Sequence, residues 1–198
     1  MEEDSMKAKM LRGELYIATD PELAAERMRC REILWELNSV APKHAQQQIP
    51  TLVSRLFANV GKNVWVEPPF RCDYGKNITV GDNFYCNFDC CFLDVCQINV
   101  GSNVLLGPAV QVYTASHPLS ASLRREGYED GSPITIGNDV WIGGGAILLP
   151  GVSIGSNVVI GAGSVVTKSI PDNVIAAGNP CKVLRPNASH REPPRQET

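Results

Sequence analysis

Histidine is the side chain best suited to accept a proton at neutral pH, and this sequence contains three, His44, His117 and His190. His44 falls in a polar linker and His190 in a polar tail, whereas His117 stands where a regular repeat gives way to a polar stretch. A histidine at such a point can act as a general base on a bound hydroxyl group. Taken alone, an isolated histidine is more typical of a surface or structural position, so the surrounding pattern has to decide.

One polar residue interrupts an apolar stretch and is a candidate for binding polar groups. Asp94 lies within the apolar run from Leu93 to Cys96, where burying a carboxylate without a partner would be costly. Asp73 and Asn87 are of types that form turns, and this structural interpretation stays open for both.

The seven cysteines look interspersed with core residues, and their number is odd. They are Cys30, Cys72, Cys86, Cys90, Cys91, Cys96 and Cys181. The group from Cys86 to Cys96 contains no CxxC pair and has no histidine nearby, which disfavours a zinc site. We expect reduced thiols that act as small inward-facing hydrophobic side chains, and no bound metal.

Composition excludes two classes of partner. Eighteen Lys and Arg against 21 Asp and Glu give a net charge of −3 without a basic run, so nucleic acid is not expected to bind. Residues 1–10 are charged and lack a signal-peptide core, and no segment approaches the roughly 18 apolar residues of a membrane span. We therefore expect a soluble cytoplasmic protein that makes no membrane contact.

The elements that must position these residues are predicted by a six-residue repeat. From Ile136 the chain reads IGNDVW, IGGGAI, LLPGVS, IGSNVV, IGAGSV and VTKSIP, with an aliphatic residue first in every unit. Six residues rotate through about 600° on an α-helix, so this stripe would spiral around one. Short strands with tight, glycine-containing corners fit the period. We expect mostly β structure, in a parallel β-helix whose strands pair with their equivalents in the next coil.

Weaker repeats extend the pattern upstream to Val60, so the β-helix is expected over residues 59–185. Val112 and Ile136 are 24 positions apart, and the polar stretch 116–133 between them breaks the repeat. This predicts a loop ejected from the coil, and long ordered loops often carry function.

Residues 1–58 predict an N-terminal helical segment. Thr19 or Asp20 can cap a helix that has Pro21 in its first turn and ends near Asn38. A second helical pattern over 45–57 contains Pro50, which is expected to kink or restart it. The polar, proline-rich tail 186–198 is expected to be disordered.

Several motifs are more specific than the repeat. They are RGELY (12–16), FRCDYG (70–75), NFDC (87–90), LDVC (93–96), TASHPL (114–119), NDVWIGGGA (138–146), VVTKSIP (165–171) and AAGNPCKV (176–183). Together they make the chain resemble the maltose and galactoside O-acetyltransferases of the hexapeptide-repeat family. The resemblance implies a left-handed β-helix and a homotrimer with acetyl-CoA in the groove between subunits. It also implies transfer of the acetyl group to a hydroxyl of a sugar such as maltose or glucose.

The resemblance assigns roles residue by residue. It implies that His117 is the general base of a direct transfer, and that Gly144 supplies a backbone N–H to the oxyanion. The residues implied to bind acetyl-CoA are Trp141, Gly144, Ala162, Thr167, Lys168, Lys182 and Arg185. Those implied to bind the sugar are Tyr16, Asp73, Asn87, Asp94 and Glu129.

Three other functions were compared with this interpretation. An acetyltransferase acting on another hydroxyl or amine acceptor, such as a galactoside, an oligosaccharide, an antibiotic or serine, remains the alternative. A γ-class carbonic anhydrase would need several histidines in the repeats, where only His117 occurs. A non-enzymatic scaffold would not be expected to keep the histidine, the tryptophan and the lysines.

Overall fold

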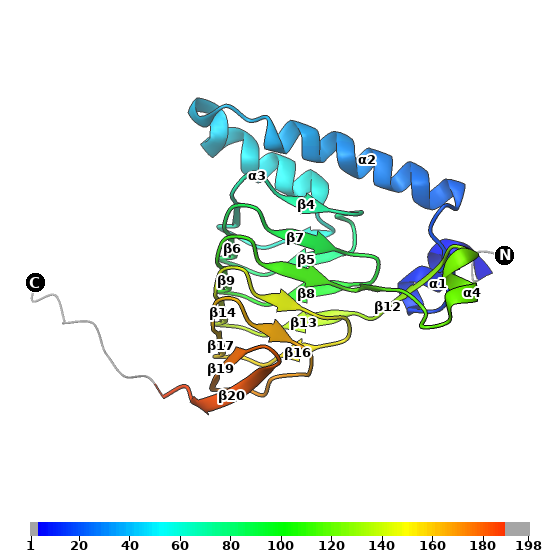
Figure 1. Cartoon of the computed structure of the whole chain (residues 1–198). Helices are drawn as coiled ribbons and strands as arrows, with labels where there is room; N and C mark the ends of the chain where they lie inside the picture. Colours follow the sequence, from blue (N-terminus) through cyan, green and yellow to red (C-terminus); the bar gives the residue numbers. More distant parts are fainter. Residues whose placement is uncertain (1–3, 189–198) are drawn as a thin grey trace, which may run out of the picture.

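The computed structural model describes residues 4–188 and shows a parallel β-helix closed at one end by helices (Figure 1). Three sheets surround the coil. The first has the order β18-β15-β10-β7-β4, the second β16-β13-β8-β5-β2, and the third β20-β19-β17-β14-β9-β6-β3. All neighbouring strands in them are parallel except β19 and β20. The expected β-helix is confirmed.

The strands are short, as the six-residue period requires. The first sheet contains β4 (Arg71–Cys72), β7 (Cys91–Leu93), β10 (Gln111–Tyr113), β15 (Ile147–Leu148) and β18 (Val165–Val166). The second contains β2 (Asn59–Val60), β5 (Ile78–Val80), β8 (Ile98–Val100), β13 (Ile134–Ile136) and β16 (Ser153–Ile154). The third contains β3 (Trp65–Val66), β6 (Tyr85–Cys86), β9 (Leu105–Leu106), β14 (Trp141–Ile142), β17 (Val159–Ile160), β19 (Val174–Gly178) and β20 (Cys181–Pro186).

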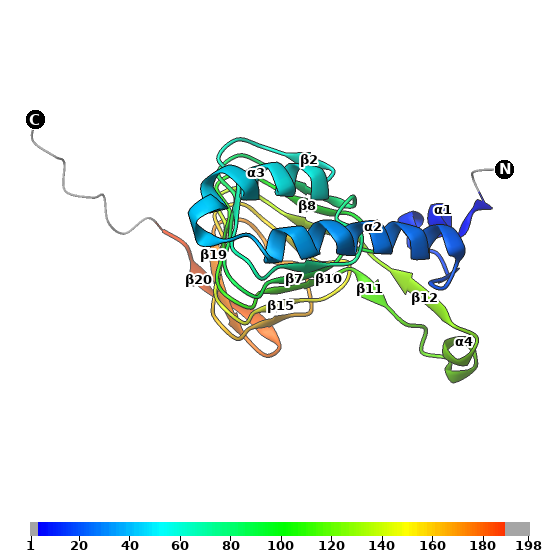
Figure 2. The same ribbon diagram turned by 90° about the horizontal axis from the view of Figure 1, so that it is seen from above.

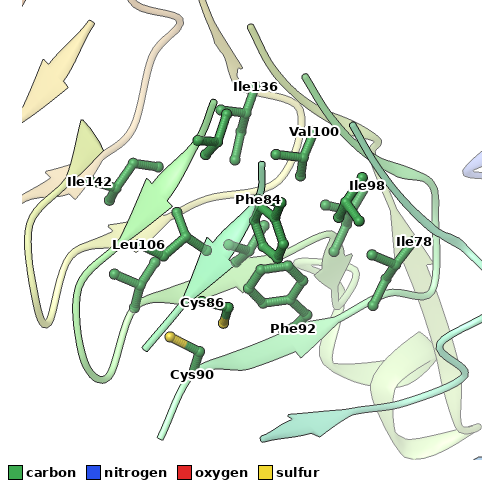
Figure 3. Close-up of a cluster of buried hydrophobic side chains, with 14 of the residues drawn as sticks. Ile78, Phe84, Cys86, Cys90, Phe92, Ile98, Val100, Leu106, Ile136 and Ile142 are labelled. Carbon is green, nitrogen blue, oxygen red and sulfur yellow. The ribbon is translucent and has the colours of Figure 1, made fainter. Parts of the chain in front are cut away.

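The register follows the repeat. Ile136 pairs with Val100 and Ile154, and Ile142 pairs with Leu106 and Ile160, so equivalent positions stack. The first and fifth residues of all six units are buried, which confirms their inward orientation. Figure 3 shows side chains of successive coils filling one interior. Cys86 and Cys90 lie among them as small core residues, and all seven cysteines are free thiols.

The N-terminal segment forms helices that cover the open end of the coil (Figures 1 and 2). Helix α2 (Pro21–Asn38) has Asp20 as its N-cap, as predicted. Helix α3 (Ala45–Leu56) follows a 3-10 turn η2 (Pro42–His44) and continues through Pro50, so of the two predicted effects, a kink or a restart, the restart does not occur. A short helix α1 (Met6–Arg12), capped by Ser5 and Gly13, was not predicted. The apolar side of α3 packs on the core.

The ejected stretch is more regular than the sequence suggested. It contains β11 (Ala115–Ser116), α4 (Ala121–Arg125) and β12 (Tyr128–Gly131). Strand β12 pairs antiparallel with β11 and with β1 (Tyr16–Ile17) near the N-terminus. The loop and the N-terminal segment therefore form one three-stranded sheet beside the coil.

The C-terminal end is ordered through strand β20. Asn187 still donates a hydrogen bond from its side chain to the Asn157 carbonyl, at 3.1 Å. The expected disorder of the tail concerns chiefly residues 189–198, which lie outside the described residues.

Candidate active site

His117 follows β11 and lines a cavity of about 310 Å³ between the ejected loop, α2 and the first sheet. Four of the residues predicted to act in the site, His117, Tyr16, Asp73 and Glu129, meet here. The full lining is Tyr16, Ala18, Arg27, Arg31, Asp73, Tyr74, Leu93, Val95, Ala115, His117 and Glu129. The His117 side chain is exposed in this cavity, whereas the following Pro118 is buried.

A partly buried hydrogen bond connects the two walls of the cavity. The Tyr16 hydroxyl donates to Glu129 Oε2 at 2.8 Å, across the antiparallel pair of β1 and β12. Burial raises the pKa of Tyr16 far above its usual value, and the Glu129 carboxylate raises it further, so the hydroxyl keeps its proton and remains a donor. Tyr16 therefore anchors Glu129 in the wall of the cavity.

Asp94 lies beneath the cavity rather than in its lining. Its Oδ1 accepts the backbone N–H groups of Asp73 and Tyr74, both at 2.9 Å, and its Oδ2 has no hydrogen-bond partner. Burial raises the pKa of Asp94 to about 7. The hydrogen bond from the Tyr74 N–H lowers this pKa, and the neighbouring Asp73 charge raises it. Asp94 thus holds the turn that carries Asp73. Its own side chain does not line the cavity.

A second group of predicted residues lies at another corner of the coil. Asn87, Gly144 and Ala162 follow β6, β14 and β17, which are members of the third sheet. Trp141 points outward from that sheet and is 54% exposed. None of these residues lines the His117 cavity, because the strands of the first sheet separate this corner from the loop.

The backbone at this second corner has free donors. Within residues 4–188 the N–H groups of Gly144 and Ala162 make no hydrogen bond, whereas those of Gly143 and Gly145 bond to Ile160 O and Pro108 O at 2.8 Å. Gly145 has a φ of +69°, in the left-handed region that favours glycine, so a glycine is needed there to form the corner. The φ of Gly144 is not in that region. The free N–H of Gly144 can bind an anionic oxygen.

The predicted coenzyme cations and Thr167 lie at the C-terminal end of the coil. Thr167 and Lys168 directly follow β18, and Lys182 and Arg185 lie on β20. All four are exposed. Exposed cations and a hydroxyl group of this kind are able to bind phosphate groups.

Known proteins match almost the whole chain. The maltose acetyltransferase hexapeptide capping motif matches residues 9–61, and the six-repeat bacterial transferase hexapeptide model matches residues 133–168. Galactoside O-acetyltransferase of Escherichia coli strain K12 is 43% identical over 180 residues, which are 91% of this chain and 88% of the relative. A maltose O-acetyltransferase structure from Clostridium difficile 630 has a TM-score of 0.91 at 51% identity, covering 93% of this chain and 98% of that one. A galactoside acetyltransferase structure in complex with coenzyme A has a TM-score of 0.89 at 42% identity, covering 93% and 92%.

The chain belongs to the maltose and galactoside O-acetyltransferase family. This membership confirms the resemblance drawn from the motifs, because the matched segments include both the capping helices and the repeats. The cavity at His117 and the free N–H groups at the second corner are two places in this chain where polar groups are available to bind ligands.

Two further observations concern metal ions and membranes. Within residues 4–188, no group of three or more His, Cys, Asp or Glu side chains is arranged to hold a metal ion. None of the helices in that range combines the length and apolar character needed to cross a bilayer.

Sequence reasoning missed three polar residues of the cavity, Arg27, Arg31 and Tyr74. Arg27 donates to the Tyr74 hydroxyl and to the Ala18 carbonyl, both at 2.6 Å, and its guanidinium lies 5.7 Å from the centre of the Tyr74 ring. Arg27 and Arg31 are one helical turn apart on α2. This i, i+4 spacing places them on the same face of the helix, and it was the feature of the sequence that could have identified them. In this family member, α2 therefore forms one wall of the cavity as well as capping the coil.

Proposed function

We propose that this protein is an acetyl-CoA-dependent sugar O-acetyltransferase that acts on a sugar such as maltose or glucose. One observation carries the proposal: in a member of an acetyltransferase family, the single histidine of the repeat region opens into a polar cavity that contains Asp73, Glu129 and two arginines. Such walls suit a polyhydroxylated acceptor, because each hydroxyl can find a donor or an acceptor.

The proposed reaction is a direct transfer. His117 accepts the proton of the acceptor hydroxyl while that oxygen forms a bond to the thioester carbonyl carbon. The carbon–sulfur bond then breaks, and the proton passes from His117 to the sulfur of coenzyme A. No acetyl group is attached to the enzyme at any stage. The free N–H of Gly144 is proposed to stabilise the negative charge that develops on the carbonyl oxygen.

Acetyl-CoA is proposed to lie along the corner formed by Gly144 and Ala162, with Trp141 beside its pantetheine arm. The unbonded Ala162 N–H supports this placement, since it can donate to an amide carbonyl of that arm. Thr167, Lys168, Lys182 and Arg185 are proposed to bind its phosphates. The coenzyme A bound to a solved galactoside acetyltransferase relative supports the choice of donor.

The complete site is proposed to form between subunits of a homotrimer. His117 and Asn87 lie on different corners of one chain, so a neighbouring chain has to bring the acceptor residue Asn87 and the coenzyme corner to the histidine. Exposed Trp141 and Leu105 are adjacent on the outer face of the third sheet and would be covered by such an interface. Because cells supply acetyl-CoA internally, we place the enzyme in the cytoplasm.

A panel assay tests the proposed activity. Purified protein is incubated with acetyl-CoA and glucose, maltose, a galactoside or serine, and released coenzyme A is measured together with the mass of the product. We expect the highest kcat/KM with glucose or maltose and a mass gain of one acetyl group on the sugar. Transfer to serine alone, or hydrolysis without an acetylated sugar, would contradict the proposal.

A further inference from the structure

Helix α2 places three arginines at alternating positions, and they face two different environments. Arg27 and Arg31, four residues apart, line the cavity that contains His117. Arg29 lines a separate hollow with Lys7 and Glu26, and its guanidinium lies 3.6 Å from the Glu26 carboxylate. The helix thus turns two guanidinium groups toward the acceptor side and one away from it.

The two arginines of the cavity differ in what they bind. Arg27 is fully engaged by the protein, since its two terminal nitrogens donate to Tyr74 and Ala18. Within residues 4–188, the Arg31 side chain forms no hydrogen bond and no ion pair. Its guanidinium is therefore free to donate, and its charge also acts on Asp73: burial raises the pKa of Asp73, and the positive charges of Arg27 and Arg31 oppose that rise.

The charges of the cavity wall balance. Two guanidinium groups, Arg27 and Arg31, stand against two carboxylate side chains, Asp73 and Glu129. A neutral polyhydroxylated molecule preserves this balance, because its hydroxyls can accept from a guanidinium and donate to a carboxylate. A charged acceptor would pair with one of these groups and leave a group of the opposite sign without a partner, which would lower its affinity.

We propose that Arg31 is a specificity-determining residue that donates hydrogen bonds to the acceptor sugar and makes the site selective for neutral sugars. This inference rests on the proposed acetyltransferase function and extends it to a residue of α2. Arg27 has the different role of a positioning residue that holds the Tyr74 ring and the chain at Ala18.

The test compares Arg31→Ala and Arg31→Lys with the matched control Arg29→Ala, which removes an arginine from the same helix outside the cavity. Steady-state kinetics give kcat and KM for glucose and for acetyl-CoA, and calorimetry gives the coenzyme A affinity. We expect Arg31→Ala to raise the glucose KM about 10-fold or more, the loss typical of a hydrogen bond to a charged group. The acetyl-CoA values should change less than twofold, Arg31→Lys should recover part of the loss, and Arg29→Ala should match the wild type.

Comparing a charged with a neutral acceptor gives a ratio of kcat/KM values that would not change if Arg31 had only a structural role. Arg31→Ala leaves the wall with an excess negative charge, so the ratio of kcat/KM for glucosamine to that for glucose should rise several-fold, most clearly at low salt. General damage to the site would lower both values together and leave the ratio unchanged.

Each outcome decides between the inference and the function on which it rests. Active wild-type enzyme with unchanged glucose KM and unchanged acceptor ratio in Arg31→Ala overturns the inference alone. Equal effects of Arg31→Ala and Arg29→Ala also overturn it, since they would show a general effect on α2. Wild-type enzyme that transfers acetyl to no neutral sugar overturns the proposed function together with the inference.

Discussion

At the scale of single residues, His117 is positioned by contacts on both sides of it in the chain. Before it, Thr114 is buried and its hydroxyl donates to Leu93 O at 2.7 Å. After it, the Arg124 guanidinium donates to the carbonyls of Pro118 and Leu119, at 2.9 and 2.8 Å. These bonds fix the backbone on either side of the histidine while its side chain stays exposed. An exposed base on a fixed backbone is well suited to meet an incoming hydroxyl group.

Replacing His117 with Ala tests its proposed role as the general base. We expect the turnover number to fall by roughly 10²- to 10⁴-fold, the usual contribution of such a base. Because the side chain is exposed and carries no part of the core, the thermal midpoint and the coenzyme A affinity should stay near their wild-type values. Turnover close to wild type with a sugar acceptor would show that the base lies elsewhere or that proton removal is not rate-limiting.

Asp94 should make stability depend on pH. Its folded-state pKa of about 7 lies above the ordinary aspartate value of 3.8, so between these values the folded protein binds more protons than the unfolded chain. The Asp94 contribution to stability is therefore complete below about pH 4 and is lost as the pH rises toward 7. Asp94→Asn keeps Oδ1 as the acceptor for the Asp73 and Tyr74 N–H groups but does not ionise.

Thermal unfolding at pH 5 and pH 8 measures this effect. We expect the midpoint of Asp94→Asn, relative to the wild type, to be higher at pH 8 than at pH 5. An equal difference at both pH values would show that Asp94 is ionised in the folded protein across this range.

At the scale of elements, the site depends on a sheet formed outside the coil. Strand β1 comes from the N-terminal segment and β12 from the ejected loop, and the Tyr16 and Glu129 side chains meet across them. Ordering a loop of this length costs conformational entropy, which other contacts have to offset. Pairing with β1 and β11 supplies the backbone bonds that hold it in one conformation. The loop therefore presents His117 as a fixed part of the fold.

Tyr16→Phe should weaken this attachment. Loss of the buried donor to Glu129 is expected to lower the free energy of unfolding by about 1 to 2 kcal/mol, measured by urea denaturation. Amide exchange at 128–131 should accelerate, because these residues form β12. Tyr85→Phe is the matched control: Tyr85 is only half-buried and its hydroxyl contacts Glu67 at 3.4 Å, a long distance for a hydrogen bond, so its removal should change stability by less than about 0.5 kcal/mol. Equal losses in both variants would contradict a special role for Tyr16.

At the scale of the whole molecule, the residues of the proposed site lie on two separate corners of the chain. One corner has His117, Asp73 and Glu129, and the other has Asn87 and the free N–H of Gly144. In a cyclic assembly of identical chains, each contact joins two different surfaces, so one corner of each copy would meet the other corner of its neighbour. The proposed homotrimer has this geometry.

Light scattering and complementation together test the assembly. We expect a mass of three times the 21.5 kDa chain at micromolar concentration. His117→Ala and Asn87→Ala should each be nearly inactive, but co-expression should restore about a quarter of the sites, where both unmodified residues meet. A monomeric mass, or mixed assemblies no more active than either variant, would place the complete site within one chain.

The sequence by itself determined the coil. A period of six leaves one arrangement in which every first residue is inward, and Ile136 and Ile142 are both buried as that period requires. Helix α2 was equally evident, since Asp20 and Pro21 are start signals that act within one turn. Local patterns succeed here because the forces they report, burial of a periodic stripe and capping, act over a few residues.

Only the tertiary structure decided how the site is assembled. Tyr16 and Glu129 are 113 positions apart, and Arg27 and Tyr74 are 47 apart, so no local period relates them. Asp94 was expected among the sugar-binding residues but lies beneath the turn at Asp73, because its hydrogen bonds go to the backbone there. The physical reason is that side chains reach a cavity through the packing of whole elements, and packing depends on contacts between segments far apart in the sequence.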